Sequence, residues 1–249
     1  MNSCINYVFT EVEDKNINTN NKTVLFLHGW GGNLNSFFPV QKSFIKKYNT
    51  LNLDFPGFGK SKEPNIPFDT YMYALSVYEI LKKLNISEII IIAHSFGGRI
   101  AILLSSIFHI KVTNLILISS AGIKPRRSLW YYFKVYTYKL FKFLVKKNII
   151  SHKFLKFFGS KDYKQLSKTM KQTFVNVVNQ DLKMYLRLIS AKCLIVWGKK
   201  DDTTPLYFAK ILHREINRSK LLVYKKSGHF CYLENKIDFC IQAEKFINS

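Results

Sequence analysis

Cysteine is scarce in this chain, and that scarcity limits the chemistry available to it. Only four cysteines occur among 249 residues, at Cys4, Cys193, Cys231 and Cys240. None belongs to a C-x-x-C pair, so their spacing fits neither a zinc site nor a disulfide framework. We expect them to act as small hydrophobic side chains. No pair of histidines has metal-ligand spacing, so we expect no metal and no cofactor.

Acidic residues are also few. The chain has 16 Asp and Glu against 38 Lys and Arg, which gives a net charge of +22. A general preference for lysine over arginine would not explain this shortage of acids. The excess predicts attraction to anions, whether substrates, acidic lipid or nucleic acid. Because no nucleic-acid-binding module is recognisable, we expect no nucleic acid partner.

Targeting and membrane-spanning segments are missing as well. Residues 1–10 lack the basic stretch and apolar run of a signal peptide. Residues 89–108 form the most apolar region, but His94, Arg99 and two glycines interrupt it, so it does not read as a membrane span. We expect a soluble protein of the reducing cytoplasm, with peripheral membrane contact as the alternative.

Short apolar runs alternate with longer helical stretches along most of the chain. The candidate strands are residues 23–27, 50–53, 89–93, 114–118, 192–196 and 220–224. The candidate helices are residues 69–84, 98–108, 205–216 and 237–248. Four consecutive isoleucines at residues 89–92 are apolar on both faces, as a strand inside a parallel sheet requires. The alternation predicts an α/β fold, a mostly parallel sheet flanked by helices.

One segment interrupts this alternation. Residues 122–190 contain no convincing strand, and their only acids are Asp162 and Asp181 against 16 basic residues. They predict a helical insertion over the carboxyl edge of the sheet. The α/β core is then built from residues 1–121 and residues 191–249.

Two glycine-containing loops resemble phosphate-binding loops only in part. A phosphate-binding loop ending at residues 59–61 would need glycine at the position of Asp54. A dinucleotide fingerprint starting at Gly29 would need glycine at the position of Leu34. Neither loop therefore predicts a nucleotide site.

The strongest local signal is the sequence Ile-Ala-His-Ser-Phe-Gly-Gly at residues 92–98. It follows a buried strand and opens a helix, so Ser95 stands on a sharp turn that lifts its hydroxyl out of the sheet. The turn needs small residues two positions before and after the serine. Ala93 and Gly97 meet this need, although alanine replaces the more common glycine. Ser95 is therefore a candidate nucleophile.

An acid and a histidine follow Ser95 in the order expected on this sheet. Asp201 and Asp202 come after the candidate strand 192–196, and His229 comes after the candidate strand 220–224. All of them fall in loops at the carboxyl ends of strands, where parallel sheets place their sites. A serine hydroxyl needs an adjacent base, which His229 would supply. The carboxylate would orient the imidazole and stabilise its cation.

With these motifs, the chain resembles the α/β-hydrolase family, in its capped branch of serine esterases and C–C hydrolases, over nearly its whole length. Residues 28–32 read His-Gly-Trp-Gly-Gly after an early strand. Residues 54–61 are similar to the family's D-x-P-G-x-G-x-S loop. The resemblance implies that residues 122–190 are a helical cap. The family spacing, Gly-x-x-Asp with proline four positions later, selects Asp201, with Asp202 as the alternative.

The resemblance also implies where a substrate would bind. It places an oxyanion hole on the backbone N–H groups of Trp30 and Phe96. The residues expected to line the substrate pocket are Gly29, His94, Trp130 and Phe230. His28 is expected to shape its loop. Arg99 is expected to form a structural ion pair, with Asp54 as the named partner, or else to bind a substrate carboxylate.

The function implied is hydrolysis of a carboxylic ester or thioester through an acyl-enzyme. The same residues fit a hydrolase that cleaves the C–C bond of a diketone. A different possibility is a non-catalytic module whose basic cap binds acidic membrane or a partner protein. Residues 129–147 place apolar and basic side chains on roughly opposite helical faces, which favours packing on the domain and, second, attachment to acidic membrane.

Overall fold

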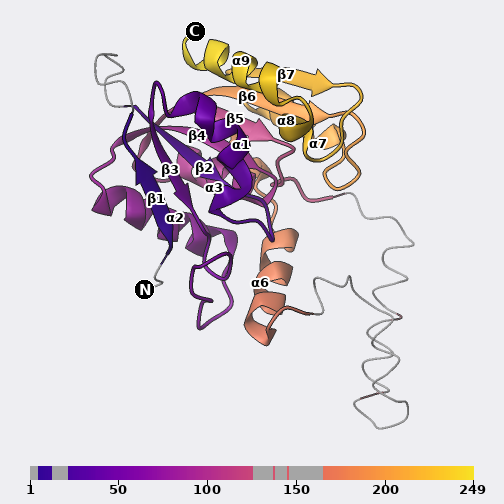
Figure 1. Ribbon diagram of the computed structural model, residues 1–249. Helices are drawn as coiled ribbons and strands as arrows, with labels where there is room; N and C mark the ends of the chain where they lie inside the picture. Colours follow the sequence, from indigo (N-terminus) through magenta and orange to yellow (C-terminus); the bar gives the residue numbers. More distant parts are fainter. Residues whose placement is uncertain (1–4, 13–21, 126–136, 138–144, 146–164) are drawn as a thin grey trace.

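The computed structural model describes residues 5–12, 22–125, 137, 145 and 165–249. The described strands form one sheet in the order β1-β3-β2-β4-β5-β6-β7 (Figure 1). They are β1 (Tyr7–Thr10), β2 (Thr23–Leu27), β3 (Asn49–Leu53), β4 (Glu88–His94), β5 (Lys111–Ile118), β6 (Lys192–Gly198) and β7 (Ser219–Tyr224). Only β1 pairs antiparallel, with β3. The predicted mostly parallel α/β sheet is confirmed.

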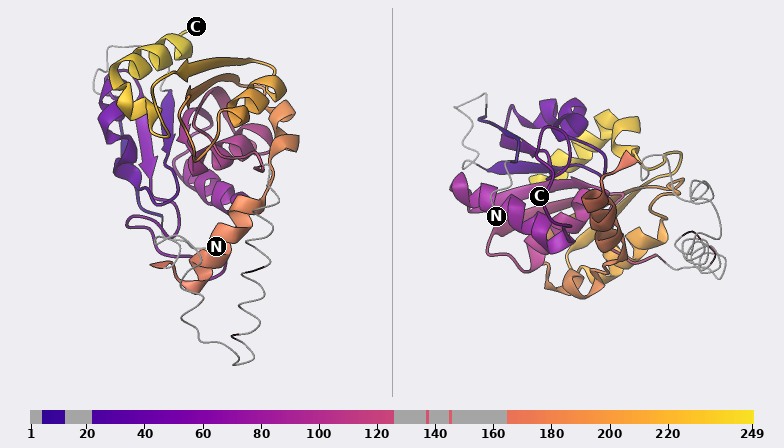
Figure 2. Two further views of the ribbon diagram at one scale, coloured as in Figure 1. Left: turned by 90° about the vertical axis from the view of Figure 1, so that its right-hand side faces the viewer. Right: turned by 90° about the horizontal axis from the view of Figure 1, so that it is seen from below.

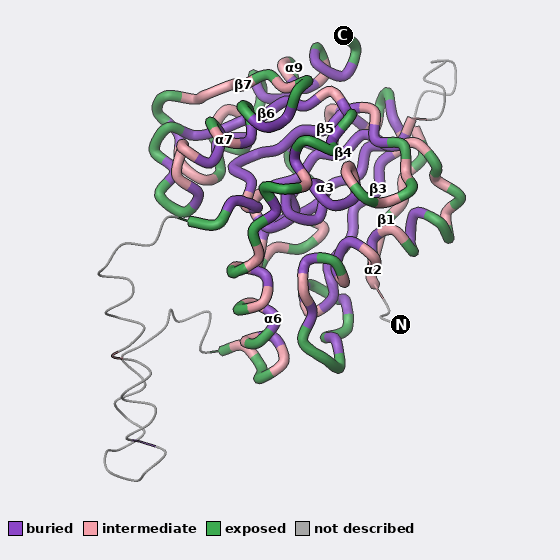
Figure 3. The backbone as a smooth tube through the Cα atoms, turned by 180° about the vertical axis from the view of Figure 1, so that it is seen from behind, coloured by how far each residue is buried: buried purple, intermediate pink, exposed green. Residues whose placement is uncertain are grey.

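The central strands are buried on both faces. In β4, Ile89, Ile91 and Ala93 face one hydrophobic cluster, while Ile90 and Ile92 face the other. Figure 3 shows the central strands buried along most of their length. Because side chains alternate between the faces of a strand, a continuous apolar run is what a sheet covered on both sides requires.

Helices cover the two faces in separate layers (Figures 1 and 2). One layer contains the 3₁₀ helix η1 (Leu34–Phe37), α1 (Phe38–Phe44), α8 (Cys231–Glu234) and α9 (Lys236–Ile247). The other contains α2 (Thr70–Lys83), α3 (Phe96–Ser106) and α7 (Tyr207–Glu215). The side chain of Asp69 caps α2 by accepting a hydrogen bond from the amide of Met72 at 2.8 Å.

Several boundaries differ from those predicted. The helix expected at residue 98 begins at Phe96, directly after Ser95. The helix expected at residue 205 begins at Tyr207, because Pro205 opens a turn in which its carbonyl accepts a hydrogen bond from Phe208 at 2.8 Å. The sequence did not predict β1, α1 or α8, which have four, seven and four residues. Elements this short carry little periodicity.

The described part of the predicted insertion contains α6 (Lys168–Asn179) and the 3₁₀ helix η3 (Lys183–Leu188). Residues 126–136, 138–144 and 146–164 lie outside the described residues. The amide of Leu182 donates to the carbonyl of Gly122 at 2.8 Å, so the chain leaves and rejoins the core at adjacent points. The amide of Phe68 donates to Thr173 Oγ1 at 2.9 Å and ties α6 to the core.

The described cysteines, Cys193, Cys231 and Cys240, are buried and free, as expected, while Cys4 lies outside the described residues. In the part of the chain that the structure describes, no helix combines the length and apolar character needed to cross a membrane.

Candidate active site

Ser95 lies at the sharp turn between the end of β4 and the start of α3. Its backbone has a φ of 52° and a ψ of −114°. A positive φ is uncommon for a residue other than glycine, and such strain tends to gather at functional sites. The end of β5 holds the turn, because the amide of Ser95 donates to the carbonyl of Ile118 at 3.0 Å. The amide of Ala121 donates to the carbonyl of Ser95 at 2.9 Å.

Gly97 lets α3 start directly against the end of β2. A Cβ atom at this position would overlap the carbonyl oxygen of Leu27 and lie 2.8 Å from the carbonyl oxygen of His28. Backbone atoms cannot move aside as a flexible side chain can. On the other side of the turn, Ala93 is fully buried. The structure therefore leaves room only for small residues on the two sides of the serine.

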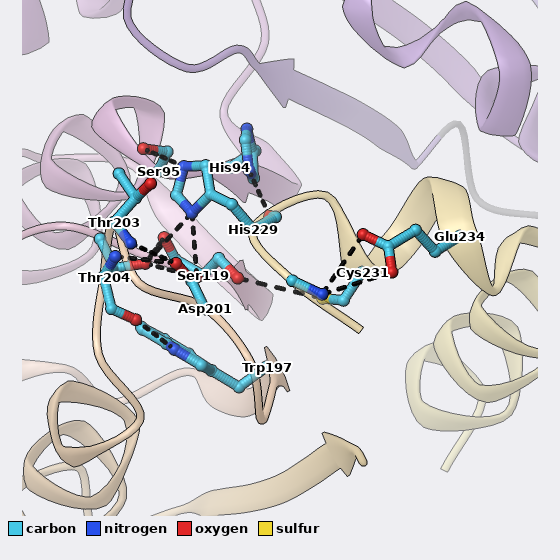
Figure 4. Close-up of polar contacts among 11 residues, drawn as sticks. His94, Ser95, Ser119, Trp197, Asp201, Thr203, Thr204, His229, Cys231 and Glu234 are labelled. Carbon is cyan, nitrogen blue, oxygen red and sulfur yellow. Dashed lines mark hydrogen bonds and ion pairs between the residues drawn. The ribbon is translucent and has the colours of Figure 1, made fainter. Parts of the chain in front are cut away.

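His229 lies between Ser95 and Asp201 (Figure 4). Its Nε2 is 3.0 Å from Ser95 Oγ, and its Nδ1 is 2.9 Å from Asp201 Oδ2. Because Nδ1–H donates to the carboxylate, Nε2 of the neutral ring is left to accept the proton of the hydroxyl. The Asp201 side chain is fully buried, whereas that of His229 is 14% exposed. The structure thus brings together the three side chains that the sequence analysis selected.

The carboxylate of Asp201 accepts several further hydrogen bonds. The amides of Thr203 and Thr204 donate to Oδ1 at 3.0 and 2.8 Å, and the Thr204 hydroxyl lies 2.7 Å from Oδ2. Burial by itself would raise the pKa of Asp201, but the hydrogen bonds from His229 and Thr204 outweigh it and hold that pKa below its ordinary value. The carboxylate is therefore ionised at neutral pH. Asp202, the alternative, is exposed.

The sequence analysis missed Thr204, a buried residue at the centre of this network. Its Oγ1 is 3.0 Å from the carbonyl of Ser119 and 3.3 Å from His229 Nδ1, besides its contact with Asp201. Its own carbonyl accepts a hydrogen bond from Trp197 Nε1 at 2.7 Å. A turn residue able to hydrogen-bond an aspartate three positions earlier was the available signal.

The loops after β6 and β7 are held against each other. The amide of Lys200 donates to the carbonyl of Ser227 at 2.9 Å. A Cβ atom at Gly198 would overlap the carbonyl of Gly228, so the two backbones meet without a side chain between them. Because Asp201 follows Lys200 and His229 follows Gly228, this close approach of the two loops brings Asp201 and His229 together.

Two buried histidines support the site without carrying charge. His94 Nε2 lies 3.0 Å from the carbonyl of His229, to which it donates. His28 Nδ1 donates to the carbonyl of Gly29 at 2.8 Å, and His28 Nε2 accepts from the amide of Phe55 at 3.1 Å. Burial lowers the pKa of His28 to about 4 and that of His94 to about 3, so both are neutral at pH 7. His28 thus shapes its loop, as predicted.

The residues expected in the substrate pocket have different surroundings. Gly29 faces the nucleophile, since a Cβ there would lie 3.4 Å from Ser95 Cβ. His94 is buried and engages the backbone of His229. Phe230 is exposed, with its ring centroid 5.1 Å from that of His94 and 5.4 Å from that of His229. Trp130 lies outside the described residues.

The amide of Trp30 belongs to the loop after β2, and the amide of Phe96 is the first of α3. Neither amide has a hydrogen-bond acceptor among residues 5–12, 22–125 and 165–249. The Trp30 ring packs edge-on against Phe96 at 5.3 Å and against Phe174 of α6 at 5.1 Å. Two N–H groups beside the serine are thus available to a ligand, and α6 packs against one of the residues that carry them.

Arg99 and Asp54 do not pair, which corrects the ion pair predicted between them. Arg99 Nη1 donates to the carbonyl of Gln180 at 2.8 Å, where the chain leaves α6. Asp54 instead accepts from the amides of Leu34 and Lys60, at 2.6 and 2.8 Å. Arg99 is thus satisfied by a carbonyl distant in sequence, and Asp54 by one amide of its own loop and one of an earlier loop. Within the described ranges, no group of three or more His, Cys, Asp or Glu side chains could hold a metal ion.

The chain is similar to known proteins over most of its length. The family model for the alpha/beta hydrolase fold matches residues 22–236. The AB hydrolase superfamily protein YisY of Bacillus subtilis is 27% identical over 92% of each chain. The pimeloyl-[acyl-carrier protein] methyl ester esterase of Wigglesworthia glossinidia brevipalpis is 25% identical over 93% of this chain and 95% of that one.

Solved structures share the fold. The esterase EaEST from Exiguobacterium antarcticum aligns with a TM-score of 0.76 and 23% identity, over 98% of this chain and 96% of that one. The likeness to this solved structure shows the fold. On the match of the family model to most of its length, the chain belongs to the alpha/beta hydrolase fold family.

Proposed function

We propose that the protein is a serine hydrolase that cleaves a carboxylic ester, or a thioester, through an acyl-enzyme. One observation carries this proposal: His229 joins Ser95 Oγ, at 3.0 Å, to the buried carboxylate of Asp201, at 2.9 Å. A base held between a nucleophile and an orienting carboxylate is the arrangement that activates a serine hydroxyl. The relative named as a pimeloyl-[acyl-carrier protein] methyl ester esterase supports an ester.

The reaction begins when Ser95 Oγ attacks the acyl carbon and its proton passes to His229 Nε2. The negative charge that develops on the carbonyl oxygen is stabilised by the amides of Trp30 and Phe96. The tetrahedral intermediate collapses as the imidazolium returns the proton to the departing alcohol or thiol, which leaves an acyl ester on Ser95. His229 then removes a proton from water, and the hydroxide attacks the acyl carbon. Collapse releases the acid and returns the proton to Ser95.

The buried Asp201 carboxylate stabilises the imidazolium at each transfer. A neutral His94 behind His229 supports the same step, because a second cation at a ring distance of 4.7 Å would oppose it. We further propose that residues 122–190 act as a cap. Helix α6, which belongs to this segment, supports the role because it packs on loops next to Ser95. Phe174 of α6 packs on Trp30, and the sulfur of Met170 lies against Gly57.

A fluorophosphonate reagent tests the activated serine. The expected result is one covalent adduct per chain by intact mass, absent in Ser95→Ala and after denaturation. Absence of an adduct at high reagent concentration would contradict the proposal and favour a non-catalytic module.

A substrate panel then separates the reactions that the same side chains could perform. It contains p-nitrophenyl esters, an acyl thioester and a vinylogous diketone. Turnover of the esters is expected. Turnover of the diketone alone would replace ester hydrolysis by C–C hydrolysis.

A further inference from the structure

Apolar side chains are exposed along the outer side of α8 and α9. Leu233, Ile237 and Ile241 are 37%, 75% and 58% exposed. Ile237 and Ile241 are four residues apart on α9, which brings them to one side of that helix, and Leu233 lies on the preceding short helix α8. The opposite side of α9 is buried in the core through residues such as Phe239 and Ala243. A surface helix that needs only to cover a sheet would carry polar side chains on its outer side.

Helix α1 extends this exposed apolar surface. It runs beside α8 and α9, as Figures 1 and 2 show. Tyr232 Oη donates to the carbonyl of Ser36 at 3.2 Å near one end, and Lys47 pairs with Glu244 at 2.7 Å near the other. Phe38, which is 52% exposed, is the first residue of α1 and follows Ser36 by two positions. We call Phe38, Leu233, Ile237 and Ile241 the outer helix face.

Lysines surround the outer helix face. Besides the paired Lys47, the exposed lysines in these helices or directly after α1 are Lys42, Lys46, Lys236 and Lys245. The loop after β7 lies beside α9, because Tyr224 Oη donates to Asp238 Oδ2 at 2.8 Å. The amide of Lys199 donates to the carbonyl of Tyr224 at 2.9 Å, which brings the loop after β6 alongside. The exposed lysines of these two loops are Lys199, Lys200, Lys225 and Lys226.

The loop lysines carry uncompensated charge. None of the four forms an ion pair with a residue that the structure describes. The nearby acids Glu234 and Asp238 accept hydrogen bonds from the neutral Gly228 amide and Tyr224 hydroxyl, and their two negative charges offset only part of the lysine charge around them. The apolar side chains of the outer helix face are therefore bordered by loop lysines that form no ion pair with the described residues.

We propose that the outer helix face docks on a bilayer containing anionic phospholipid. Aliphatic and aromatic side chains would enter the boundary between headgroups and acyl chains, and the surrounding lysines would contact lipid phosphates. The net charge of +22 favours the same surface at longer range. Membrane contact through the basic segment at residues 129–147 stays a prediction from sequence.

A second copy of the chain fits the outer helix face less well. A symmetric dimer would place the same patch on itself, so two surfaces on which lysines outnumber acids would meet. Two rows of like charge at a contact oppose association, whereas a sheet of lipid phosphates neutralises them. The charge around the outer helix face therefore favours an anionic bilayer over a second copy of the chain.

Docking in this orientation has a consequence for the substrate, which rests on the proposed function. Phe230 is exposed next to His229, and its chain continues directly into α8. The outer helix face therefore starts at the rim of the site. The substrate class that a docked enzyme would reach is an acyl ester of an amphiphile held in the same bilayer.

Vesicle flotation tests the docking without reference to catalysis. The full chain is mixed with vesicles of phosphatidylcholine, with and without phosphatidylglycerol. The test variant carries Ile237→Glu with Ile241→Glu. The matched control carries Met184→Glu with Leu188→Glu, because these η3 side chains are 75% and 57% exposed with the same four-residue spacing. Fluorophosphonate labelling reports that each variant retains a folded site.

The native chain is expected to float with the anionic vesicles and not with phosphatidylcholine alone. The test pair is expected to need about tenfold more anionic lipid, or more, for half-binding, while the control pair binds like the native chain. No binding of the native chain, or equal loss in both pairs, would overturn the proposal. A native dimer that the test pair dissociates would overturn it in favour of a second copy. Failure of labelling with intact flotation would refute the proposed hydrolase and leave the docking standing.

Discussion

Replacing Thr204 by valine removes one hydroxyl from the middle of the site and nearly keeps the shape of the side chain. The hydroxyl contacts Asp201 Oδ2 at 2.7 Å and the carbonyl of Ser119 at 3.0 Å. The variant therefore takes one donor from a buried carboxylate. The backbone amides of residues 203 and 204, which also donate to that carboxylate, remain in place.

The size of the effect follows from the loss of a hydrogen bond to a charged group. Such a bond contributes about 1.5–3 kcal/mol, and about 1.4 kcal/mol corresponds to tenfold in rate. We expect kcat for a p-nitrophenyl ester to fall about ten- to a hundredfold, with KM little changed because Thr204 positions Asp201 and His229 rather than substrate. Thr204→Ser, which keeps the hydroxyl, should retain most of the rate. Thr203→Val is the matched control, since Thr203 is exposed and reaches Asp201 through its amide.

The stability of the Thr204→Val variant should depend on pH in a defined direction. Because the folded pKa of Asp201 lies below its unfolded value, its carboxylate adds stability above about pH 4, and this stability is lost as the pH falls through the folded pKa. The variant raises the folded pKa, so its deficit in unfolding free energy is largest at neutral pH and shrinks in acid. Urea unfolding at several pH values measures this. The prediction for catalysis is wrong if Thr204→Val keeps the native kcat, or if Thr203→Val lowers kcat by as much as Thr204→Val does.

Three further outcomes follow from the same contacts. Asp201→Asn should lower kcat by about 10⁴-fold because it removes the carboxylate that orients the imidazole, whereas Asp202→Asn should leave kcat unchanged; the reverse result would reassign the acid. Gly97→Ala should lower the unfolding free energy in urea by about 1–3 kcal/mol, because its methyl group meets the backbone end of β2, and unchanged stability would contradict the close approach. His28 and His94 stay neutral when folded but take protons when unfolded, so unfolding free energy should fall as the pH drops below about 6.5, by up to about 1.4 kcal/mol per pH unit for each histidine; a flat profile from pH 7 to pH 5 would argue against two buried neutral rings.

The central sheet was predictable because its signal is local. A run such as Ile89–Ile92 is apolar at every position, and only a strand covered on both faces explains it. The strand β1 gives no such signal, since Tyr-Val-Phe-Thr becomes a strand through its antiparallel pairing with β3, more than forty residues away. Helix α1 is only seven residues long and mixes buried and exposed phenylalanines, so no clear period marks it.

The sequence predicted the three central residues of the candidate site, but not the contacts that hold the segments around them. Parallel strands end at one edge, so a serine, an acid and a histidine that each follow a strand must meet there. Those contacts depend on segments that return to this edge from elsewhere. Arg99 was expected to pair with an acid such as Asp54, although no sequence signal places the two residues next to each other. Its partner is the carbonyl of Gln180, which only the return of the chain from α6 brings within 2.8 Å.

The candidate site and the outer helix face meet in the loop that carries His229 and Phe230. The hydrogen bonds of this loop hold His229 in place independently of the outer helix face. His229 and Phe230 are consecutive, so the base and the rim of the site share a backbone. The carbonyl of Ser227 accepts from the loop after β6 at 2.9 Å, and its hydroxyl accepts from Asn235 Nδ2, at the start of α9, at 2.7 Å. These bonds use no side chain of the outer helix face. A bilayer that takes up this face therefore leaves the distances around His229 unchanged and alters only the local concentration of amphiphilic esters. Docking should thus lower the apparent KM for vesicle-borne esters while kcat for water-soluble esters keeps its unbound value.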